Sequence, residues 1–399
     1  MRHVYVGMSG GVDSSLTAAL LVEQGFRVTG VYMKNWTQDL PGMKCPWAED
    51  LADAKRVAVQ LGIDFKVFDF EKEYKQQVVD YMVDEYKAGR TPNPDIMCNQ
   101  EVKFKLFLEA ALDDGADMIA TGHYARVSET TEPATFSEPV VSRHAVSPVD
   151  SLRPAELAAL RQSSFGQEST DVTAGLAKGS SKAAGSVLCC AVDTDKDQTY
   201  FLYRVTSEAL AKTLFPLGDY TKSQVREMAK SRGLWTAQKK ESMGVCFVGA
   251  VGMRDFLSQY VSARPGDIIE KSTGKKLGRH DGAIYYTLGQ RHGLDIGGGL
   301  PYYVVGKDMQ VNEVYVSTNL NDDAMWRKEL ELTDVHWIAD APSQQDTLSV
   351  RLRHRGALLP CTLRGNTLQL HDTERAPTAG QSAVFYRGNV CLGGGIVIE

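Results

Sequence analysis

A glycine-rich hexapeptide and two cysteines are the residues of this chain whose types and surroundings point to chemistry. The hexapeptide, at residues 9–14, reads Ser-Gly-Gly-Val-Asp-Ser and stands between a short apolar run and a run with helical character. Its glycines would let the backbone approach a ligand closely, and N–H groups at the start of a helix attract anions. The layout predicts a phosphate-binding loop. It is not the Walker pattern, because no Gly-Lys-Ser/Thr follows.

The hexapeptide resembles the pyrophosphatase loop (PP-loop) of enzymes that cleave ATP between the α and β phosphates. A strand-to-helix turn without a ligand is the alternative interpretation. Its position directly after the first apolar run favours the phosphate-binding interpretation.

The two cysteines, Cys98 and Cys246, have unusual surroundings. Cys98 lies in GRTPNPDIMCNQEVKF (residues 89–104), where two prolines fix an extended turn before a helical pattern begins. A cysteine near a helix N-terminus has its thiolate favoured by the helix dipole. Cys246 lies in Gly-Val-Cys-Phe. A lone cysteine is more often a small buried hydrophobic residue, and these two contexts argue against that alternative.

The elements that must position these residues alternate in the first part of the chain. We expect strands at 4–8, 27–33, 64–70 and 118–121, and helices at 14–23, 48–61, 71–87 and 102–113. Such alternation predicts an α/β fold with a parallel sheet covered on both faces. Ligands of these sheets bind at the carboxyl ends of the strands. Three segments should therefore converge at this edge of the sheet: the loop at 7–14, Met33 and Gly122-His123.

Composition shifts divide the rest of the chain. We predict a PP-loop catalytic domain at 1–250, a small central domain at 251–308 with dense turn signals, and a C-terminal β-barrel of short alternating strands at 309–399. Residues 128–188 are rich in Ser, Ala, Thr and Pro and contain neither Trp nor Tyr. We expect this segment to be a mostly disordered surface insertion in the first domain.

Overall composition limits the class of protein. A hydrophobic content of 43% and a charged content of 24% are ordinary for a soluble globular chain. We find no membrane-spanning run and no signal or transit peptide. The net charge of −6 argues against a protein that coats nucleic acid non-specifically, but it allows a local basic patch. Seven scattered cysteines fit a reducing compartment, the cytoplasm, with the mitochondrial matrix as the alternative.

Eight motifs run from the first residues to the last: GMSGGVDSS, KNW, GRTPNPDIMCN, ATGHYAR, DKDQTYFLY, GVCFVG, YYTLGQRHGL and GQSAVFYRGNVCLGGG. Together they resemble the tRNA-specific 2-thiouridylase family, whose members replace the C2 oxygen of the wobble uridine in certain tRNAs with sulfur. The resemblance implies an ATP-dependent tRNA-uridine 2-sulfurtransferase. Its implied partners are Lys, Glu and Gln tRNAs and a persulfide-donating sulfur carrier or cysteine desulfurase. It also implies a monomer with no membrane partner.

The resemblance also implies a mechanism. The uridine C2 oxygen is adenylated with release of pyrophosphate, and sulfur transfer then releases AMP. The cofactor is ATP with Mg²⁺, for which no direct metal motif is present. Cys246 would carry the persulfide and Cys98 would be the nucleophile that resolves it through a transient disulfide; direct attack by the persulfide stays open. Asp95 would be a general acid or base, with a turn-forming Asx residue as its alternative.

The binding residues carry over in the same way. Implied ATP contacts are Gly7, Met8, Ser9, Gly10, Gly11, Val12, Asp13, Ser14, Met33 and Gly122. Implied tRNA contacts, around a base that has left its stack, are Asn93, Pro94, Asp95, His123, Lys196, Asp197, Gln198, Arg353, His354 and Gln381. One position departs from the family, whose barrel strand reads Arg-Tyr-Arg where this chain has Arg353-His354-Arg355. A solvated charged strand is the alternative for that cluster.

Two other functions compete with this interpretation. A different PP-loop enzyme could adenylate a carbonyl or carboxylate for attack by an amine, but no glutaminase pattern is evident. A non-catalytic RNA-binding protein could keep the fold, but it would not need Asp13, Asp95, Cys98 and Cys246. The five other cysteines are predicted to be packing residues, and the lack of a Cys-x-x-Cys pair disfavours an iron–sulfur cluster.

Overall fold

The computed structural model describes residues 1–39, 45–129, 185–240, 252–297, 299, 301–319, 321–343 and 346–398. Cys246 and most of the predicted insertion lie outside the described residues. Among the described helices, none is both long and apolar enough to cross a membrane.

The first part of the chain forms the predicted parallel sheet. Its strand order is β3-β2-β1-β4-β7, and all four pairings are parallel. The bounds are β1 (His3–Gly7), β2 (Arg27–Lys34), β3 (Asp64–Asp69), β4 (Met118–Ala120) and β7 (Thr213–Leu214). The register of β1 on β2 runs from His3 opposite Arg27 to Gly7 opposite Val31. Because β1 lies between β2 and β4, the strand order reverses at β1, and a ligand crevice is expected at its carboxyl end.

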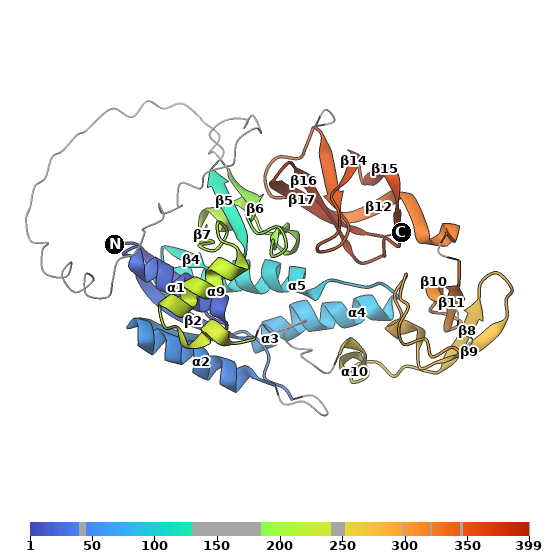
Figure 1. Cartoon of the computed structure of the whole chain (residues 1–399), viewed down its shortest axis with the longest axis horizontal. Helices are drawn as coiled ribbons and strands as arrows, with labels where there is room; N and C mark the ends of the chain where they lie inside the picture. The colour runs from blue at the N-terminus through green and yellow to red at the C-terminus, as the bar shows by residue number, and fades with distance from the viewer. Residues whose placement is uncertain are drawn as a thin grey trace, which may run out of the picture.

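Helices cover both faces of this sheet, as the alternating pattern predicted (Figure 1). One face packs against α1 (Val12–Glu23), α2 (Trp47–Leu61) and α9 (Lys222–Ser231). The other face packs against α3 (Glu71–Tyr74), η1 (Lys75–Asp80), α4 (Tyr81–Lys87), α5 (Pro94–Met97), η2 (Cys98–Leu106) and α6 (Phe107–Asp113). Buried aromatic side chains, including Tyr74 and Phe107, fill the second layer and fix the helices that carry Cys98.

The last part of the chain is a closed six-stranded antiparallel barrel, in agreement with the predicted fold class. Its strands are β12 (Trp326–Trp337), β13 (Leu348–Arg351), β14 (Leu359–Arg364), β15 (Thr367–Arg375), β16 (Ser382–Arg387) and β17 (Val390–Val397). Pairing of β12 with both β15 and β17 closes the barrel. Phe385 and Leu368 are fully buried inside it.

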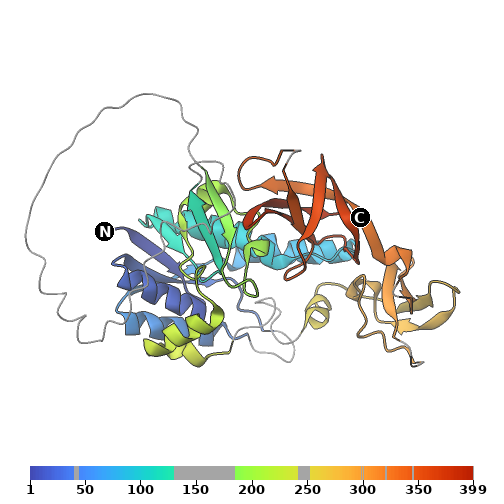
Figure 2. The ribbon, with the colours of Figure 1, turned by 45° about the horizontal axis from the view of Figure 1, so that its top comes forward.

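A two-stranded extension joins the barrel to the first domain. Strands β5 (Ala125–Glu129) and β6 (Ser186–Cys190) pair with each other, and β6 also pairs with β17 (Figure 2). The expected insertion at 128–188 therefore begins and ends inside these strands. β5 and β6 therefore extend the barrel sheet, while the parallel sheet stays a separate sheet that is linked to them through the chain.

The central domain is a four-stranded sheet of order β10-β11-β8-β9. Its strands are β8 (Gly266–Glu270), β9 (Lys276–His280), β10 (Tyr303–Asp308) and β11 (Glu313–Ser317). We expected residues from 309 onward to belong to the barrel, and for β11 this was wrong. β11 pairs in parallel with β8, and such a distant parallel pairing leaves no local signal in the sequence. The barrel begins at Trp326.

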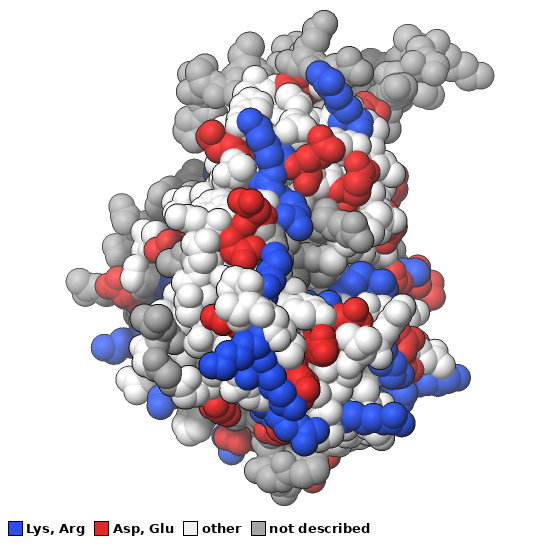
Figure 3. Space-filling view, turned by 90° about the vertical axis from the view of Figure 1, so that its right-hand side faces the viewer, with Lys and Arg blue, Asp and Glu red and all other residues white. Residues whose placement is uncertain are grey.

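Short helical elements complete the described chain: α8 (Ser207–Ala211), α10 (Met253–Leu257), η4 (Thr199–Phe201), η5 (Trp235–Gln238), η6 (Ala283–Tyr285) and η7 (Asp323–Met325). Figure 3 views the end of the molecule formed by the central domain and shows basic side chains beside acidic ones. Ion pairs such as Lys271–Asp322 and Lys276–Asp267 account for part of this mixing.

Removal of the Phe385 side chain should destabilise the barrel. Phe385 is 0% exposed and contacts Trp337, with ring centroids 5.5 Å apart. Phe385→Ala should cost about 3–5 kcal/mol of unfolding free energy, because it leaves a cavity in a closed core. Urea unfolding followed by circular dichroism measures this cost. Leu358→Ala, at a side chain that is 40% exposed, is the control and should cost less than about 1 kcal/mol. Equal costs for the two variants would contradict the assigned barrel core.

Candidate active site

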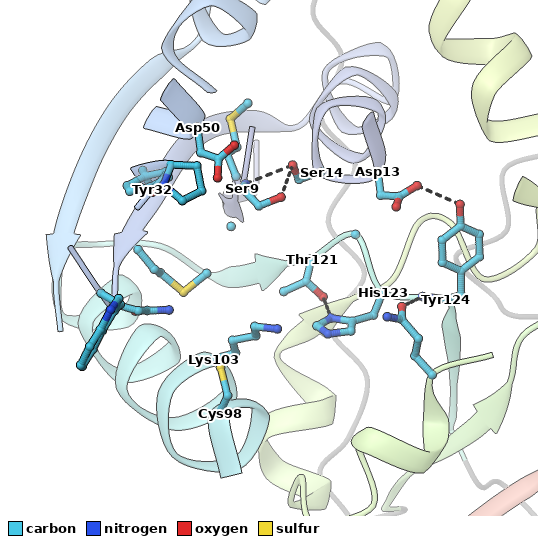
Figure 4. Close-up of a pocket in the computed structure, with 18 of the residues that line it drawn as sticks. Ser9, Asp13, Ser14, Tyr32, Asp50, Cys98, Lys103, Thr121, His123 and Tyr124 are labelled. Atoms are coloured by element: carbon cyan, nitrogen blue, oxygen red, sulfur yellow. Dashed lines mark hydrogen bonds between the residues drawn. The ribbon is translucent and has the colours of Figure 1, made fainter. Parts of the chain in front are cut away.

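A cavity of about 470 Å³ opens at the carboxyl edge of the parallel sheet (Figure 4). Of the predicted residues, its lining includes Gly7, Met8, Ser9, Asp13, Ser14, Met33, Cys98, Gly122, His123, Lys196, Gln198 and His354. The remaining predicted residues that the structure describes lie outside the lining: Gly10, Gly11, Val12, Asn93, Pro94, Asp95, Asp197, Arg353 and Gln381. The expected convergence of the loop, Met33 and Gly122-His123 is confirmed.

The loop between β1 and α1 has the shape of an anion cradle. Gly10 has φ +73°, and a Cβ atom there would lie 2.4 Å from the carbonyl oxygen of Asp50. Gly11 is the N-cap of α1, and no side chain caps the helix. A Cβ atom at Gly122 would lie 2.8 Å from the backbone nitrogen of Ser14. Close backbone packing and uncapped N–H groups at the start of a helix fit a bound phosphate.

Lys222 is a functional candidate that the sequence analysis missed. Its Nζ donates to both carboxylate oxygens of Asp13 at 2.8 Å, and the Tyr124 hydroxyl donates to Asp13 Oδ1 at 2.9 Å. Lys222 is the first residue of α9 and lines the cavity. Nothing local in the sequence signalled a contact with a loop 209 positions away. The loop thus has a basic partner at the cavity wall.

Cys98 lies at the start of η2, a π-helical segment, and its side chain is 4% exposed at the cavity wall. The expected start of this helix at residue 102 was wrong. Pro94 is already the first residue of a helical turn, so Cys98 is the fifth helical residue. Proline fits the first helical position, where its missing N–H is not needed. The dipole argument for a Cys98 thiolate is weakened accordingly.

Asp95 lies one turn before Cys98. The N-cap of α5 is Asn93, whose Oδ1 accepts from the Asp95 N–H at 3.2 Å. The Asx turn given as the alternative role for Asp95 is therefore formed by Asn93. Burial raises the pKa of the Asp95 carboxyl, while the nearby Lys103 ammonium lowers it. A raised pKa is compatible with proton transfer, which stays a proposal.

His123 lies on the cavity wall as a neutral imidazole. The ring is buried, and its Nδ1 is 2.8 Å from the Thr121 hydroxyl. Burial, with the charge of Lys103, holds the pKa of His123 well below its ordinary value. Phe104 and Phe215 flank the ring at centroid distances of 5.6 and 6.2 Å. These contacts fix the ring orientation.

The barrel supplies one wall of the cavity through His354 and Arg355. The His354 ring lies 4.5 Å from the Phe201 ring, and burial lowers the pKa of His354 to about 4. Arg355 has φ +60° and donates from Nε to the carbonyl oxygen of Asp195 at 3.0 Å. Arg353, by contrast, is exposed and pairs with Glu374. The expected placement of residues 353–355 on a barrel strand was wrong, because β13 ends at Arg351 and these residues form the following turn. Within this turn Arg353 is solvated and His354 is not.

Asp197 differs from its expected role as a direct tRNA contact. It is 3% exposed and accepts from the Ala191 N–H at 3.0 Å and the Thr199 hydroxyl at 2.7 Å. It also pairs with Arg351 of the barrel at 3.4 Å. The motif resemblance predicts which residue type stands at position 197, but it does not predict the direction in which the side chain points. In this structure Asp197 fixes the loop whose neighbours Lys196 and Gln198 line the cavity.

A turn of the barrel holds the chain that leads to Cys98. Gln381 Nε2 donates to the Thr91 carbonyl oxygen at 2.7 Å, and the Thr91 N–H donates to the Ala379 carbonyl oxygen at 2.8 Å. A Cβ atom at Gly380 would lie 2.8 Å from the Thr91 nitrogen. The central domain reaches the same place, where the Thr287 and Thr91 hydroxyls are 3.2 Å apart. Three domains therefore meet at Thr91.

The other cysteines have the character of packing residues. Cys45, Cys189, Cys361 and Cys391 are buried, and burial raises the pKa of each thiol, to about 11 for Cys189 and about 12 for Cys361. Burial also raises the pKa of the partly buried Cys190 to about 12. Such thiols are poor nucleophiles. Within the described ranges, no group of three or more His, Cys, Asp and Glu side chains is placed to hold a metal ion.

Comparisons with known proteins match the whole chain. Family models match as tRNA methyl transferase HUP domain at residues 2–145 and 157–250, tRNA methyl transferase PRC-barrel domain at 254–318, and aminomethyltransferase beta-barrel domain at 327–397. The chain is 42% identical over 405 residues to the tRNA-specific 2-thiouridylase MnmA of Staphylococcus aureus, covering 99% of this chain and 95% of the relative. It is 41% identical to the proteins of that name from Bacillus subtilis, over 99% and 94% of the two chains, and Exiguobacterium sibiricum, over 99% and 93%.

Solved structures give a weaker likeness. An NMN synthetase from Francisella tularensis has a TM-score of 0.31 and 15% identity, covering 60% of this chain and 66% of that one. This likeness is too distant to assign a fold or a function.

Substitution of Gly10 should remove anion binding at the loop. Gly10→Ala places a methyl group against the Asp50 carbonyl, so the loop must move, and affinity for an ATP analogue should fall by about tenfold or more. Gly25→Ala is the matched control, because Gly25 has φ +81° and open space around its missing Cβ. It should cost about 1–2 kcal/mol of stability and leave binding unchanged. Calorimetric titration of both variants checks this, and equal losses of affinity would contradict the assigned cradle.

His354 should contribute to acid sensitivity. Its pKa is lowered from 6.5 to about 4 in the folded protein, so the neutral form stabilises the fold fully above pH 6.5. That contribution is lost as the pH falls from 6.5 towards 4, because the unfolded chain then binds the proton more tightly. His354→Gln should therefore flatten the decline in unfolding free energy between pH 7 and 4.5, measured by urea titration. His371→Gln, at an exposed side chain, is the control. An unchanged decline in His354→Gln would refute the assignment.

Proposed function

The chain belongs to the tRNA-specific 2-thiouridylase family, and from that premise we propose that it replaces the C2 oxygen of a tRNA wobble uridine with sulfur in an ATP-dependent reaction. The observation that carries the proposal is that Cys98 and the phosphate-binding loop line the same cavity. A thiol beside a nucleotide site suits a reaction in which an activated oxygen is replaced by sulfur. Neither a nucleotide-binding protein nor an RNA-binding protein alone would need both.

ATP with Mg²⁺ is the proposed cofactor. The N–H groups of the Gly7–Ser14 loop would hold the pyrophosphate part, and Met33 and Gly122 would contact the adenosine part. The cradle at Gly10 and the Lys222 ammonium fit a polyphosphate. Mg²⁺ would neutralise phosphate charge when bound.

The proposed reaction has two steps. The uracil C2 oxygen attacks the α-phosphorus of ATP, and the bond to pyrophosphate breaks. Sulfur then attacks C2, and AMP leaves with the former uracil oxygen. The first step turns a poor leaving group into a good one. The cavity would also have to receive a flipped base, at a cost of about a few kcal/mol in lost stacking.

The sulfur would come from a persulfide on Cys246, which lies outside the described residues. The Cys98 thiolate would attack the Cys246 sulfur and form a Cys98–Cys246 disulfide. This releases hydrosulfide, which attacks C2. The terminal sulfur of the persulfide is reduced while the two cysteines are oxidised, so an external thiol reductant must restore them. Direct attack by the persulfide is the other route.

The remaining site roles are also proposals. Asp95, with a buried carboxyl of raised pKa, is the proposed general acid or base. The proposed tRNA contacts are Asn93, Pro94, Asp95, His123, Lys196, Gln198, Arg353, His354 and Gln381, and Asp197 would act by positioning Lys196 and Gln198. The proposed partners are Lys, Glu and Gln tRNAs and a persulfide-donating sulfur carrier or cysteine desulfurase. The monomeric state stays a prediction, as does location in the cytoplasm, with the mitochondrial matrix as the alternative.

Two alternatives make different demands on the site. The family-model descriptions name methyl transfer, a reaction that needs no ATP-cleaving loop. A PP-loop enzyme that forms an amide would need the loop but no thiol. The position of Cys98 at the cavity wall, beside the loop, therefore favours thiolation over both.

Nucleoside mass spectrometry tests the proposal. The purified protein, an unmodified glutamate tRNA transcript, Mg-ATP, a cysteine desulfurase with cysteine as persulfide donor and a thiol reductant should yield 2-thiouridine. Cys98→Ser should reduce the product by at least about 100-fold while the affinity for an ATP analogue stays within about twofold, because the thiol is lost and the phosphate loop is untouched. Cys361→Ala, which removes a buried barrel thiol, is the control and should retain thiolation. Full product with Cys98→Ser would refute the nucleophile, and AMP formation without 2-thiouridine would indicate another acceptor.

A further inference from the structure

Lys103 is a cavity residue for which the mechanism above has no role. It belongs to η2 and lines the cavity with Cys98. Figure 4 shows its side chain extending into the space between the phosphate loop and Cys98. It was not singled out from the sequence, because a lysine in a helical pattern normally lies on a solvated face.

The π-helical geometry of η2 explains why Lys103 and Cys98 share a wall. In an α-helix, residues five positions apart would be separated by about 140° around the axis, on different faces. In a π-helix the hydrogen bonds run between residues five positions apart, so these residues lie nearly above one another. The segment from Cys98 to Leu106 is π-helical. The irregular turn therefore brings an ammonium group to the face that carries the thiol.

The Lys103 ammonium forms no ion pair with the residues that the structure describes, although the buried Asp95 carboxyl is near enough to be affected by its charge. Among the residues that the structure describes, no side-chain acceptor lies within hydrogen-bonding distance of its Nζ. Its neighbour Lys105 is different, because it donates to Glu101 at 2.8 Å on the outside of the same helix. The other cavity lysine at the loop, Lys222, is paired with Asp13. An unpaired, half-buried ammonium is costly unless an anion joins it.

The charge of Lys103 acts on its surroundings. Burial raises the pKa of Asp95, and the Lys103 charge opposes that rise; for His123, burial lowers the pKa and the Lys103 charge adds to the lowering. His123, whose pKa is lowered chiefly by burial, is neutral and does not compete with Lys103 for an anion. Lys103 therefore directs a positive group into the region between the loop and Cys98.

We propose that the Lys103 ammonium binds the α-phosphate of the nucleotide and stabilises the negative charge that develops there during adenylation. The nucleotide as ligand rests on the proposed function. The position supports the α-phosphate, because this phosphate must lie between the pyrophosphate held by the loop and the base beside Cys98. A fixed positive group at the atom under attack lowers the barrier without transferring a proton. Lys103 would then be a catalytic residue.

Calorimetric titration of variants with two probes tests this proposal. The probes are α,β-methylene-ATP, which carries the α-phosphate and resists cleavage, and adenosine, which has no phosphate. Lys103→Met should weaken binding of the ATP analogue by about 10- to 100-fold and leave adenosine affinity within about twofold. Lys103→Arg, which keeps the charge, should recover most of the affinity. Lys105→Met removes the same charge from the same helix and should bind both probes as the wild type does.

Two results would overturn the proposal. One is a Lys103→Met protein that binds the ATP analogue as tightly as Lys105→Met does. The other is an equal loss of affinity for the analogue and adenosine, which would indicate a distorted pocket. A different result would overturn the proposed function alone. Lys103-dependent binding of the analogue in a protein that makes no 2-thiouridine would refute thiolation and leave this inference standing.

Discussion

The position of Cys98 depends on how the chain from Arg90 to Pro94 is held. The main chain of Thr91 pairs with Ala379 of the barrel, and Gln381 donates to the carbonyl oxygen of the same residue. The Thr287 hydroxyl of the central domain is 3.2 Å from that of Thr91. Since Pro94 starts the helical segment that contains Cys98, the barrel and central domain both determine where the thiol lies. This explains why a nucleotide-binding sheet carries two further domains.

The charge of the cavity also limits which ligands the site can bind. Lys222 neutralises Asp13 at the loop, and the Lys103 ammonium is directed into the space beside Cys98. His123 and His354 are both held neutral, chiefly by burial. The site therefore suits an anionic nucleotide together with an uncharged base. Asp197, buried between the first domain and Arg351 of the barrel, keeps this arrangement in place without contacting the cavity.

The sequence was sufficient to predict what depends on local pattern. Strands β1 to β4, their helices and the loop follow from periodicity and glycine placement, and α2 and β2 were each placed within a residue at either end. The two-residue strand β7 was not predicted, because so short a strand has no periodicity. The features that the sequence did not predict depend on contacts between residues that are far apart in the chain. Lys222 reaches Asp13 across 209 positions, and β11 pairs in parallel with β8. The π-helical turn that brings Lys103 to the face of Cys98 leaves no pattern distinct from an ordinary helix. Asp197 was predicted by resemblance, which does not give side-chain direction.

A crystal structure of the protein with bound α,β-methylene-ATP and Mg²⁺ tests the central claim most directly. That claim is that the phosphate loop, Lys103 and Cys98 face one reaction centre. We expect the β and γ phosphates at the Gly7–Ser14 loop and the α-phosphate within hydrogen-bonding distance of Lys103 Nζ, on the side that faces Cys98. A nucleotide whose phosphates lie away from the loop, or whose α-phosphate is directed away from both Lys103 and Cys98, would contradict it.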